Sequence, residues 1–221
     1  MKHLLIIGNS AAGISCAENI RKKDTQIKIT ILSKEDYTAY NRCLISYYLA
    51  GDVKEDKLVY RAKDFYKNNN IELLLNKKAL RIDTKKNQAV LEDKTRLDYD
   101  LLLLATGSSP KFPEIKGIHK KGVCGFRTIS DTKEMLDLAH ASPCACVWGG
   151  GLIGLKAAYG LKKRNLDVKV IVKSSHVVSQ ILDTHSSEML KKRLLAHGVE
   201  ILTGVDVAEV IGNGDCKAVK L

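Results

Sequence analysis

The chain has 221 residues, of which 45% are hydrophobic and 28% charged, and its formal net charge is +11. This balance is ordinary for one large or two small globular domains, and no apolar run approaches the roughly 18 residues that a membrane span needs. The lysines are spread along the whole chain without a basic tail or an aromatic–basic repeat, so solvated helix ends and loops are favoured over nucleic-acid binding.

Cysteine usage and the amino terminus bear on the compartment. The six cysteines are scattered rather than spaced like a disulfide scaffold, which favours free thiols in a reducing compartment. Only Cys144 and Cys146 are close together, and without further ligands at a set spacing they are expected to be buried strand residues. The histidines show no ligand spacing either, so no metal site is expected. The first strand begins at Lys2–His3 and leaves no room for a signal peptide, so a cytoplasmic protein is expected.

The first half of the chain opens with a predicted β-α-β unit. Residues 2–7 predict a buried strand, residues 8–13 a turn, and a helix over about 12–23 leads to a strand at 27–32. The crossover of such a unit is expected to be right-handed. The polar segment 55–69, with its spaced apolar positions, predicts a helix. Four further strands are predicted, the last of them buried: 71–75, 79–82, 88–92 and 101–107.

Pro110 and Pro113 bracket a predicted crossing between two domains. Beyond them, Asp131 and Glu134 have capping-box spacing and predict the start of a helix that ends near residue 141. A second β-α-β unit follows, and then a helix that Gly198 is expected to end in the left-handed region. The elements predicted here are a strand at 144–148, a turn at 149–154, helices to about 164 and over 184–196, strands at 168–172 and 199–202, and a hairpin at 213–214.

Both strand–helix turns are rich in glycine. A dinucleotide-binding turn needs three small residues: one permits the tight turn, one lets the backbone approach the pyrophosphate, and one lets the helix pack on the strand. In the second turn these roles fall on Gly149, Gly151 and Gly154. In the first turn Gly8 and Gly13 hold the outer positions, and Ser10 replaces the middle glycine. The alternative is that the glycines serve only close strand–helix packing.

An acid after the second strand of such a unit is expected to hydrogen-bond a ribose. In the first unit Glu35 is chosen for this role, and the alternative is a solvated acid at a strand end. In the second unit the corresponding residue is Lys173, which cannot accept from a hydroxyl but can meet a 2′-phosphate. The second site is therefore expected to favour NADP, or not to discriminate between NAD and NADP.

Motifs in order along the whole chain carry a family resemblance. They are IIGNSAAGISCAENI, ITILSKEDYTAYNRCLISYYLAGD, YDLLLLATGSSPKFPEIKGI, FRTISD, VWGGGLIGLKAAYGL, and GVEILTGVDV. With them the sequence resembles the FAD- and NAD(P)H-dependent pyridine nucleotide-disulfide oxidoreductase superfamily, and within it the nitrite reductase large-subunit and rubredoxin reductase branch.

The resemblance implies an α/β fold of two Rossmann-like dinucleotide-binding domains, the glutathione reductase-like FAD/NAD(P)-binding fold. Residues 1–113 would form the first segment of the FAD-binding domain and residues 114–221 the NAD(P)H-binding domain inserted into it. The carboxyl-terminal part of the FAD domain, which follows the insertion in the family, is absent from this sequence.

The resemblance also implies site residues. The FAD pyrophosphate would lie against the first turn, and NAD(P)H against the second. Arg42 would lie near the phosphates or the isoalloxazine, the backbone near Ala79 would meet the adenine, and Arg127 would lie on the flavin side. The remaining residues are, for FAD, Gly8, Ser10, Ala11, Ala12, Gly13, Glu35, Ala105, Thr106 and Gly107, and for NAD(P)H, Gly149, Gly151, Leu152, Ile153, Gly154 and Lys173.

Two departures concern the catalytic centre. The paired redox cysteines of the disulfide reductases are absent, and Tyr47 stands where a lysine is common in ferredoxin reductase relatives. Cys43 falls where single-cysteine NADH oxidases, peroxidases and coenzyme A disulfide reductases carry their redox thiol. A thiolate there could exchange electrons with the flavin or become a sulfenic acid, and the alternative is a small residue packed near the flavin.

The activity that the resemblance implies is hydride transfer from NAD(P)H to FAD, followed by electron delivery to a protein or small-molecule acceptor. The basic chain would suit an acidic electron carrier such as rubredoxin. One alternative is an NADH oxidase, peroxidase or coenzyme A disulfide reductase that uses Cys43. Another is a non-catalytic nucleotide-binding redox sensor or an inactive fragment. The acceptor, the choice between NAD and NADP, and the oligomeric state stay open.

Overall fold

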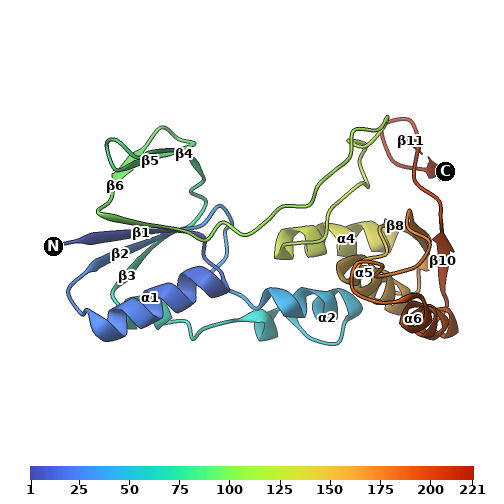
Figure 1. Cartoon of the computed structure of the whole chain (residues 1–221), viewed down its shortest axis with the longest axis horizontal. Coiled ribbons are helices and arrows are strands. Elements are labelled where there is room, and N and C mark those ends of the chain that lie inside the picture. Colours follow the sequence, from blue (N-terminus) through green and yellow to red (C-terminus); the bar gives the residue numbers. More distant parts are fainter. The chain divides into compact units, whose positions relative to one another are not determined.

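The computed structural model describes all 221 residues, and backbone contacts divide them into two compact units (Figure 1). Unit 1 consists of Met1–Arg42 and Asp56–Ser108, and unit 2 of Cys43–Glu55 and Ser109–Leu221. The division near residue 108 lies close to the domain boundary that the sequence suggests after residue 113. Residues 43–55, however, belong by their contacts to the second unit.

Unit 1 is built on a parallel sheet in the order β3-β2-β1-β7. The first β-α-β unit is confirmed: β1 (His3–Ile7) pairs in parallel with β2 (Lys28–Leu32), and α1 (Ala11–Lys23) connects them. The buried side chains of Ile14 and Ala17 belong to the apolar cluster of this sheet, as the helical spacing predicts. The other two strands are β3 (Ile71–Leu74) and β7 (Leu101–Leu104).

A second, antiparallel sheet completes unit 1. Its strands are β4 (Ala79–Asp83), β5 (Gln88–Leu91) and β6 (Arg96–Asp98). Its apolar residues Ala89 and Leu91 form one buried cluster with Leu5 and Leu32 of the parallel sheet. Within this unit the parallel sheet therefore lies between α1 and the antiparallel sheet, as Figure 1 shows.

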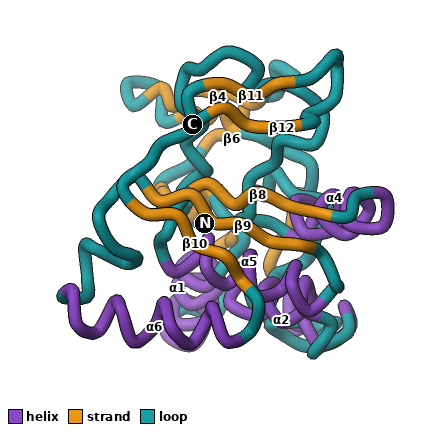
Figure 2. Tube along the Cα trace, turned by 90° about the vertical axis from the view of Figure 1, so that its right-hand side faces the viewer, coloured by secondary structure: helices purple, strands orange, loops and turns teal.

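Unit 2 is built on a parallel sheet in the order β10-β9-β8 (Figure 2). Alternate strand residues Val168, Val170 and Val172 are buried in one core with Ala158 and Leu161 of the connecting helix. The second β-α-β unit and the terminal hairpin are thus confirmed. The elements are α4 (Ile129–Ala141), β8 (Cys144–Trp148), α5 (Leu152–Lys163), β9 (Asp167–Val172), α6 (Thr184–Ala196), β10 (Val199–Thr203), β11 (Glu209–Ile211) and β12 (Ala218–Lys220).

The short helix α2 (Ile45–Ala50), which the sequence analysis did not predict, explains why residues 43–55 belong to unit 2. It packs against α5 at Gly160, where an added Cβ would come within 3.1 Å of the fully buried Leu49. The Arg164 guanidinium donates to the carbonyl oxygens of Leu49 at 2.7 Å and Tyr48 at 3.2 Å. The bond to Leu49 O satisfies a carbonyl at the end of α2 that has no partner inside the helix, and Tyr48 O also accepts from Gly51 N at 3.1 Å.

The predicted helix over 55–69 is wrong. Only a 3₁₀ turn (Glu55–Leu58) and one helical turn, α3 (Phe65–Asn68), form there. Between them the backbone bonds to another segment: Asn41 N donates to Leu58 O at 2.6 Å, and Tyr60 N donates to Ala39 O at 3.1 Å. Because these groups are satisfied by the earlier segment, the helical hydrogen-bond ladder cannot run through.

Two predictions of burial are also wrong. Cys144 and Cys146 are exposed, because they lie on the face of β8 opposite the core residues Ala145 and Val147. The leucine run 101–104 is a strand, but Leu104 keeps 62% of its surface exposed. The reason is that β7 is an edge strand of its sheet and has less cover than β1 or β2.

The capping box of α4 lies one turn earlier than predicted. Thr128, not Asp131, is the N-cap: its hydroxyl accepts from Asp131 N at 3.0 Å, and the Asp131 carboxylate accepts from Thr128 N at 2.8 Å. The ends of α6 and the left-handed Gly198 behind it are as predicted. None of the helices combines the length and apolar composition of a membrane span.

We expect Thr128→Ala to lower the free energy of unfolding by about 1 kcal/mol, because it leaves Asp131 N without its acceptor. Denaturant unfolding of the full chain, monitored by circular dichroism, measures the change. Thr128→Ser keeps the hydroxyl and should retain most of the stability, and Ser179→Ala, at an exposed turn position, is the control. An equal loss in Thr128→Ala and Ser179→Ala would contradict the capping role.

Candidate functional site

The first glycine turn, between β1 and α1, has room for glycine alone at its outer positions. Gly8 has a φ of +127°, and a Cβ there would come within 2.1 Å of Ala105 O. A Cβ on Gly13 would come within 2.0 Å of Gly8 O. Gly8 N donates to Leu32 O at 2.9 Å, which ties the turn to the next strand. The structure thus brings Gly8, Gly13 and Ala105 together, a contact between two chain segments that the sequence does not indicate.

The second turn, between β8 and α5, repeats this geometry in unit 2. Gly149 has a φ of +124°, and its N–H donates to Ile171 O at 2.9 Å. A Cβ on Gly154 would come within 2.2 Å of Gly149 O. The two turns are therefore the same structural device, built twice from distant parts of the chain.

The middle positions of the turns, Ser10 and Gly151, differ from the outer positions in their surroundings. Each is the N-cap of its helix in an extended conformation, and neither helix start has a side-chain cap. A Cβ on Gly151 would meet nothing within 4 Å. Neither backbone conformation nor packing therefore requires glycine at 151, and the space beside it is open.

A helix amino terminus that borders open space can bind an anion. The first backbone N–H groups of each helix have no partner inside it, and the helix dipole is positive at this end. The residues beside them are exposed: Ala11 and Ala12 at α1, and Leu152 and Ile153, each 54% exposed, at α5. Phosphate oxygens are the ligands that such termini bind.

Asn9 anchors the first turn through a network that the sequence analysis missed. The Tyr66 hydroxyl donates to Asn9 Oδ1 at 2.8 Å and accepts from Ala39 N at 2.9 Å. Asn9 Nδ2 in turn donates to the carbonyl oxygen of Tyr37 at 3.3 Å. Burial raises the pKa of Tyr66, so its phenol keeps the proton that it donates. These bonds fix the turn from the side of the loop after β2.

Glu35 and Arg42, two of the predicted site residues, are brought together. The Arg42 guanidinium lies 2.8 Å from Glu35 Oε1, and the Tyr40 hydroxyl donates to Glu35 Oε2 at 2.6 Å. The guanidinium also lies over the Tyr40 ring, 4.7 Å from its centroid. The Glu35 side chain is 17% exposed, so it is neither a solvated strand-end acid nor without partners. Tyr40 is a member of this group that sequence reasoning did not identify.

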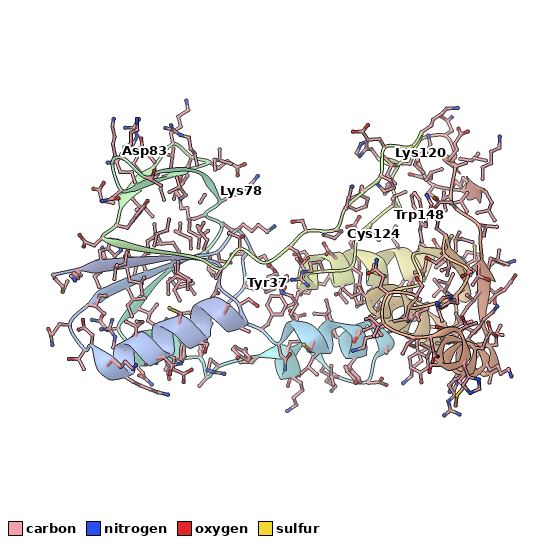
Figure 3. All side chains as sticks on the ribbon, in the orientation of Figure 1. Tyr37, Lys78, Asp83, Lys120, Cys124 and Trp148 are labelled. Carbon is pink, nitrogen blue, oxygen red and sulfur yellow. The ribbon has the colours of Figure 1, made fainter.

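Beyond the carboxyl end of β9 stands a second charged group. Lys173 Nζ lies 3.0 Å from Asp206 Oδ2, and the Trp148 indole donates to Asp206 Oδ1 at 2.8 Å. Figure 3 labels Trp148, the last residue of β8 and the neighbour of Gly149. Hydrogen bonds lower the pKa of Asp206 below its usual value, and the bond from Lys173 has a larger effect than the bond from Trp148. Asp206 was not predicted; its only signal is a position just past a parallel strand, where ligand sites of such sheets gather.

Among the remaining predicted residues, Thr106 lies beside the first turn, because its backbone nitrogen would be 3.3 Å from a Cβ on Gly8. Ala79 is the first residue of β4 and packs into the cluster between the sheets of unit 1. Thr106 and Gly107 follow Ala105 and are exposed. Arg127 belongs to unit 2, where its backbone N–H donates to Asp131 Oδ2 at 2.7 Å beside the start of α4.

The cysteines differ sharply in their surroundings. Cys43, in the 3₁₀ turn Arg42–Leu44, is exposed. Cys124, labelled in Figure 3, packs against the core of unit 2, and burial raises its pKa to about 11. The structure contains no disulfide and no cluster of three or more potential metal ligands.

Alkylation at increasing pH should separate these thiols, because the thiolate is the nucleophile. With a pKa of about 11, only about a thousandth of Cys124 is thiolate at pH 8. We expect iodoacetamide to label Cys43 at pH 8 and Cys124 only as the pH approaches 11, as measured by mass spectrometry of peptides. Cys144, which is also exposed, is the internal control. Equal rates for Cys43 and Cys124 at pH 8 would contradict the burial of Cys124.

The chain matches one family model over residues 2–221, described as pyridine nucleotide-disulphide oxidoreductase. It is 38% identical over 215 residues to a nitrite reductase [NAD(P)H] of Bacillus subtilis, covering 96% of this chain and 26% of the relative. It is 34% identical over 223 residues to an NADH oxidase of Methanocaldococcus jannaschii, covering 97% and 50%. It is 30% identical over 213 residues to a rubredoxin-NAD(+) reductase of Pseudomonas putida, covering 95% and 54%.

The chain is also similar to a solved structure. An NAD-dependent persulfide reductase from A. fulgidus superposes with a TM-score of 0.91 at 29% sequence identity, over 96% of this chain and 42% of that one. The chain thus spans between about a quarter and about half of the length of these known proteins.

Proposed function

Because the chain belongs to the pyridine nucleotide-disulphide oxidoreductase family, whose members use FAD and NADH or NADPH, we propose that it passes a hydride from NAD(P)H to FAD and the electrons on to an acceptor. The observation that carries the proposal is Gly151. The fold does not need a glycine there, whereas the backbone approach of a pyrophosphate does. The similarity to nitrite and rubredoxin reductases extends over nearly the whole chain.

The two glycine turns take different cofactors in this proposal. The first turn, in unit 1, binds the FAD pyrophosphate through the backbone N–H groups of residues 11–13, and the Ser10 hydroxyl donates a further hydrogen bond. The second turn, in unit 2, binds the pyrophosphate of NAD(P)H through residues 151–154. Unit 1 is accordingly the first segment of an FAD-binding domain, and unit 2 carries the nicotinamide-binding domain.

Glu35 accepts hydrogen bonds from the FAD adenosine ribose. Each carboxylate oxygen has two acceptor sites, so the bonds from Tyr40 and Arg42 leave capacity for the ribose hydroxyls. Those bonds also hold the carboxylate in one orientation. The small residues Ala105 and Gly107 let the dinucleotide pass close to the backbone, and Ala79 lies by the adenine. FAD, when bound, supplies the redox chemistry, and the protein supplies binding and orientation.

Gly151→Asp tests the proposal without harming the fold. Aspartate is a favoured N-cap, its charge suits the helix dipole, and its Cβ would meet no protein atom. We expect stability to be unchanged or higher, and the affinity for both NADH and NADPH to fall at least about tenfold, because the carboxylate repels the pyrophosphate. Titration of the purified protein, with the flavin spectrum followed on anaerobic reduction, measures both the binding and the hydride transfer.

Asn213→Asp is the matched control, because it adds the same charge at an exposed position in the β11–β12 hairpin. If Gly151→Asp binds NAD(P)H as the wild type does, the turn serves packing only and the proposal fails. A purified protein that shows no flavin band after incubation with FAD would instead support a non-catalytic or inactive chain.

An acidic electron-carrier protein is the acceptor that we propose. The net charge of +11 favours association with acidic partners, and rubredoxin reductases are among the relatives. A cytoplasmic location belongs to the same proposal, and the free cysteines suit such a reducing compartment.

A second candidate is a thiol-dependent oxidase or peroxidase. Cys43 is exposed, and one relative is an NADH oxidase. Hydrogen peroxide would oxidise the Cys43 thiol to a sulfenic acid and release water. Two electrons and a proton from NADH, with one further proton taken up from the solvent, would restore the thiol and release a second water and NAD⁺.

Cys43→Ser should abolish peroxide-dependent NADH consumption and leave flavin reduction by NADH intact, if this second activity is real. Cys144→Ser removes another exposed thiol, from β8, and should change neither rate. Peroxide turnover that is unchanged in Cys43→Ser would eliminate the second candidate.

A further inference from the structure

Asp206 joins two elements of the proposed NAD(P)H site. It follows β10, and its Oδ1 accepts from Trp148 Nε1 at 2.8 Å and from Val207 N at 3.0 Å. Its Oδ2 lies 3.0 Å from Lys173 Nζ. One carboxylate therefore contacts the residue before the glycine turn and the residue after β9.

Both contacts lie beside the second glycine turn. Trp148 directly precedes Gly149. Lys173 directly follows Val172, whose methyl groups would lie within 2.8 Å of a Cβ on Gly150. The residue at the end of this second strand is the one that meets the adenosine ribose in dinucleotide-binding units. Lys173, and Asp206 with it, thus stands where the 2′-substituent of the cofactor would lie.

We propose that Asp206 is a specificity-determining residue, which selects NADH over NADPH by neutralising Lys173 and by placing a fixed negative charge beside the ribose. The inference rests on the proposed function and deepens it. It is the opposite of the preference for NADP that Lys173 by itself suggests, because in the folded protein Lys173 is paired with Asp206.

The argument depends on which partner is held in place. Asp206 is bonded by three donors and its side chain is 38% exposed, whereas the Lys173 side chain is 81% exposed. The carboxylate is therefore held by Trp148 and Val207 apart from its contact with Lys173, whereas the lysine side chain is largely exposed to solvent. A 2′-phosphate has to compete with Asp206 for Lys173 and lies close to a carboxylate that stays ionised, since hydrogen bonds lower its pKa. A ribose with free hydroxyls meets no repulsion and finds an acceptor.

Asp206→Asn tests this charge effect. The amide oxygen still accepts from Trp148 and Val207, so the local structure is kept while the charge is lost. We expect the affinity for NADPH to rise about tenfold and the affinity for NADH to change less than threefold. Fluorescence of Trp148, the only tryptophan of the chain, reports each titration, and calorimetry gives an independent dissociation constant.

Two further variants show whether the effect acts through Lys173. Asp206→Asn combined with Lys173→Met should lose the gain in NADPH affinity, because no cation remains for the 2′-phosphate. Glu200→Gln removes the carboxylate of the Lys169–Glu200 pair, 3.0 Å apart on β9 and β10, and changes the net charge by the same amount. It should leave the preference for NADH as it is in the wild type.

The outcomes are distinguishable. An unchanged ratio of NADH to NADPH affinity in Asp206→Asn, or an equal shift in Glu200→Gln, overturns the role of Asp206 while the proposed function stands. A wild-type protein that binds neither dinucleotide overturns the proposed function, and the inference falls with it.

Discussion

Each half of this protein depends on one close approach, that of a helix to the turn that precedes it. The space where Gly13 and Gly154 would carry a Cβ lies 2.0 Å and 2.2 Å from the carbonyl oxygens of Gly8 and Gly149. Only glycine allows the helix to start so close to its strand. This start leaves the first N–H groups of α1 and α5 pointing beyond the strand ends, so binding chemistry and packing share one constraint.

The acids near these helix starts are satisfied by donors from other elements. Tyr40 and Arg42 hold Glu35, and Trp148 and Lys173 hold Asp206. An acid held in this way keeps one orientation, and a ligand that approaches it meets a charge partly balanced by its neighbours. Two carboxylates are therefore placed in different surroundings by their partners: Glu35 pairs with a half-buried guanidinium, and Asp206 pairs with an exposed ammonium.

The wrong predictions have a common cause in contacts between distant segments. The stretch 55–69 has helical spacing, but its backbone bonds to residues 39–41 take precedence over a continuous helix. Helix α2 is short and has no helix-starting signal, and Arg164 stabilises its end from more than 100 residues away. The strand cysteines at 144 and 146 were assigned the wrong exposure because alternation shows which residues share a face and not which face is covered.

The sequence by itself determined the two strand–turn–helix units, their glycine positions and the family. These depend on local spacing: the glycines that touch are five residues apart, and strand and helix periodicities repeat over a few residues. Only the tertiary structure decided what surrounds the turns. Tyr66 reaches Asn9 across 57 positions and Asp206 reaches Trp148 across 58, and no local pattern marks such partners. Their roles arise because the fold brings the carboxyl ends of parallel strands to one edge.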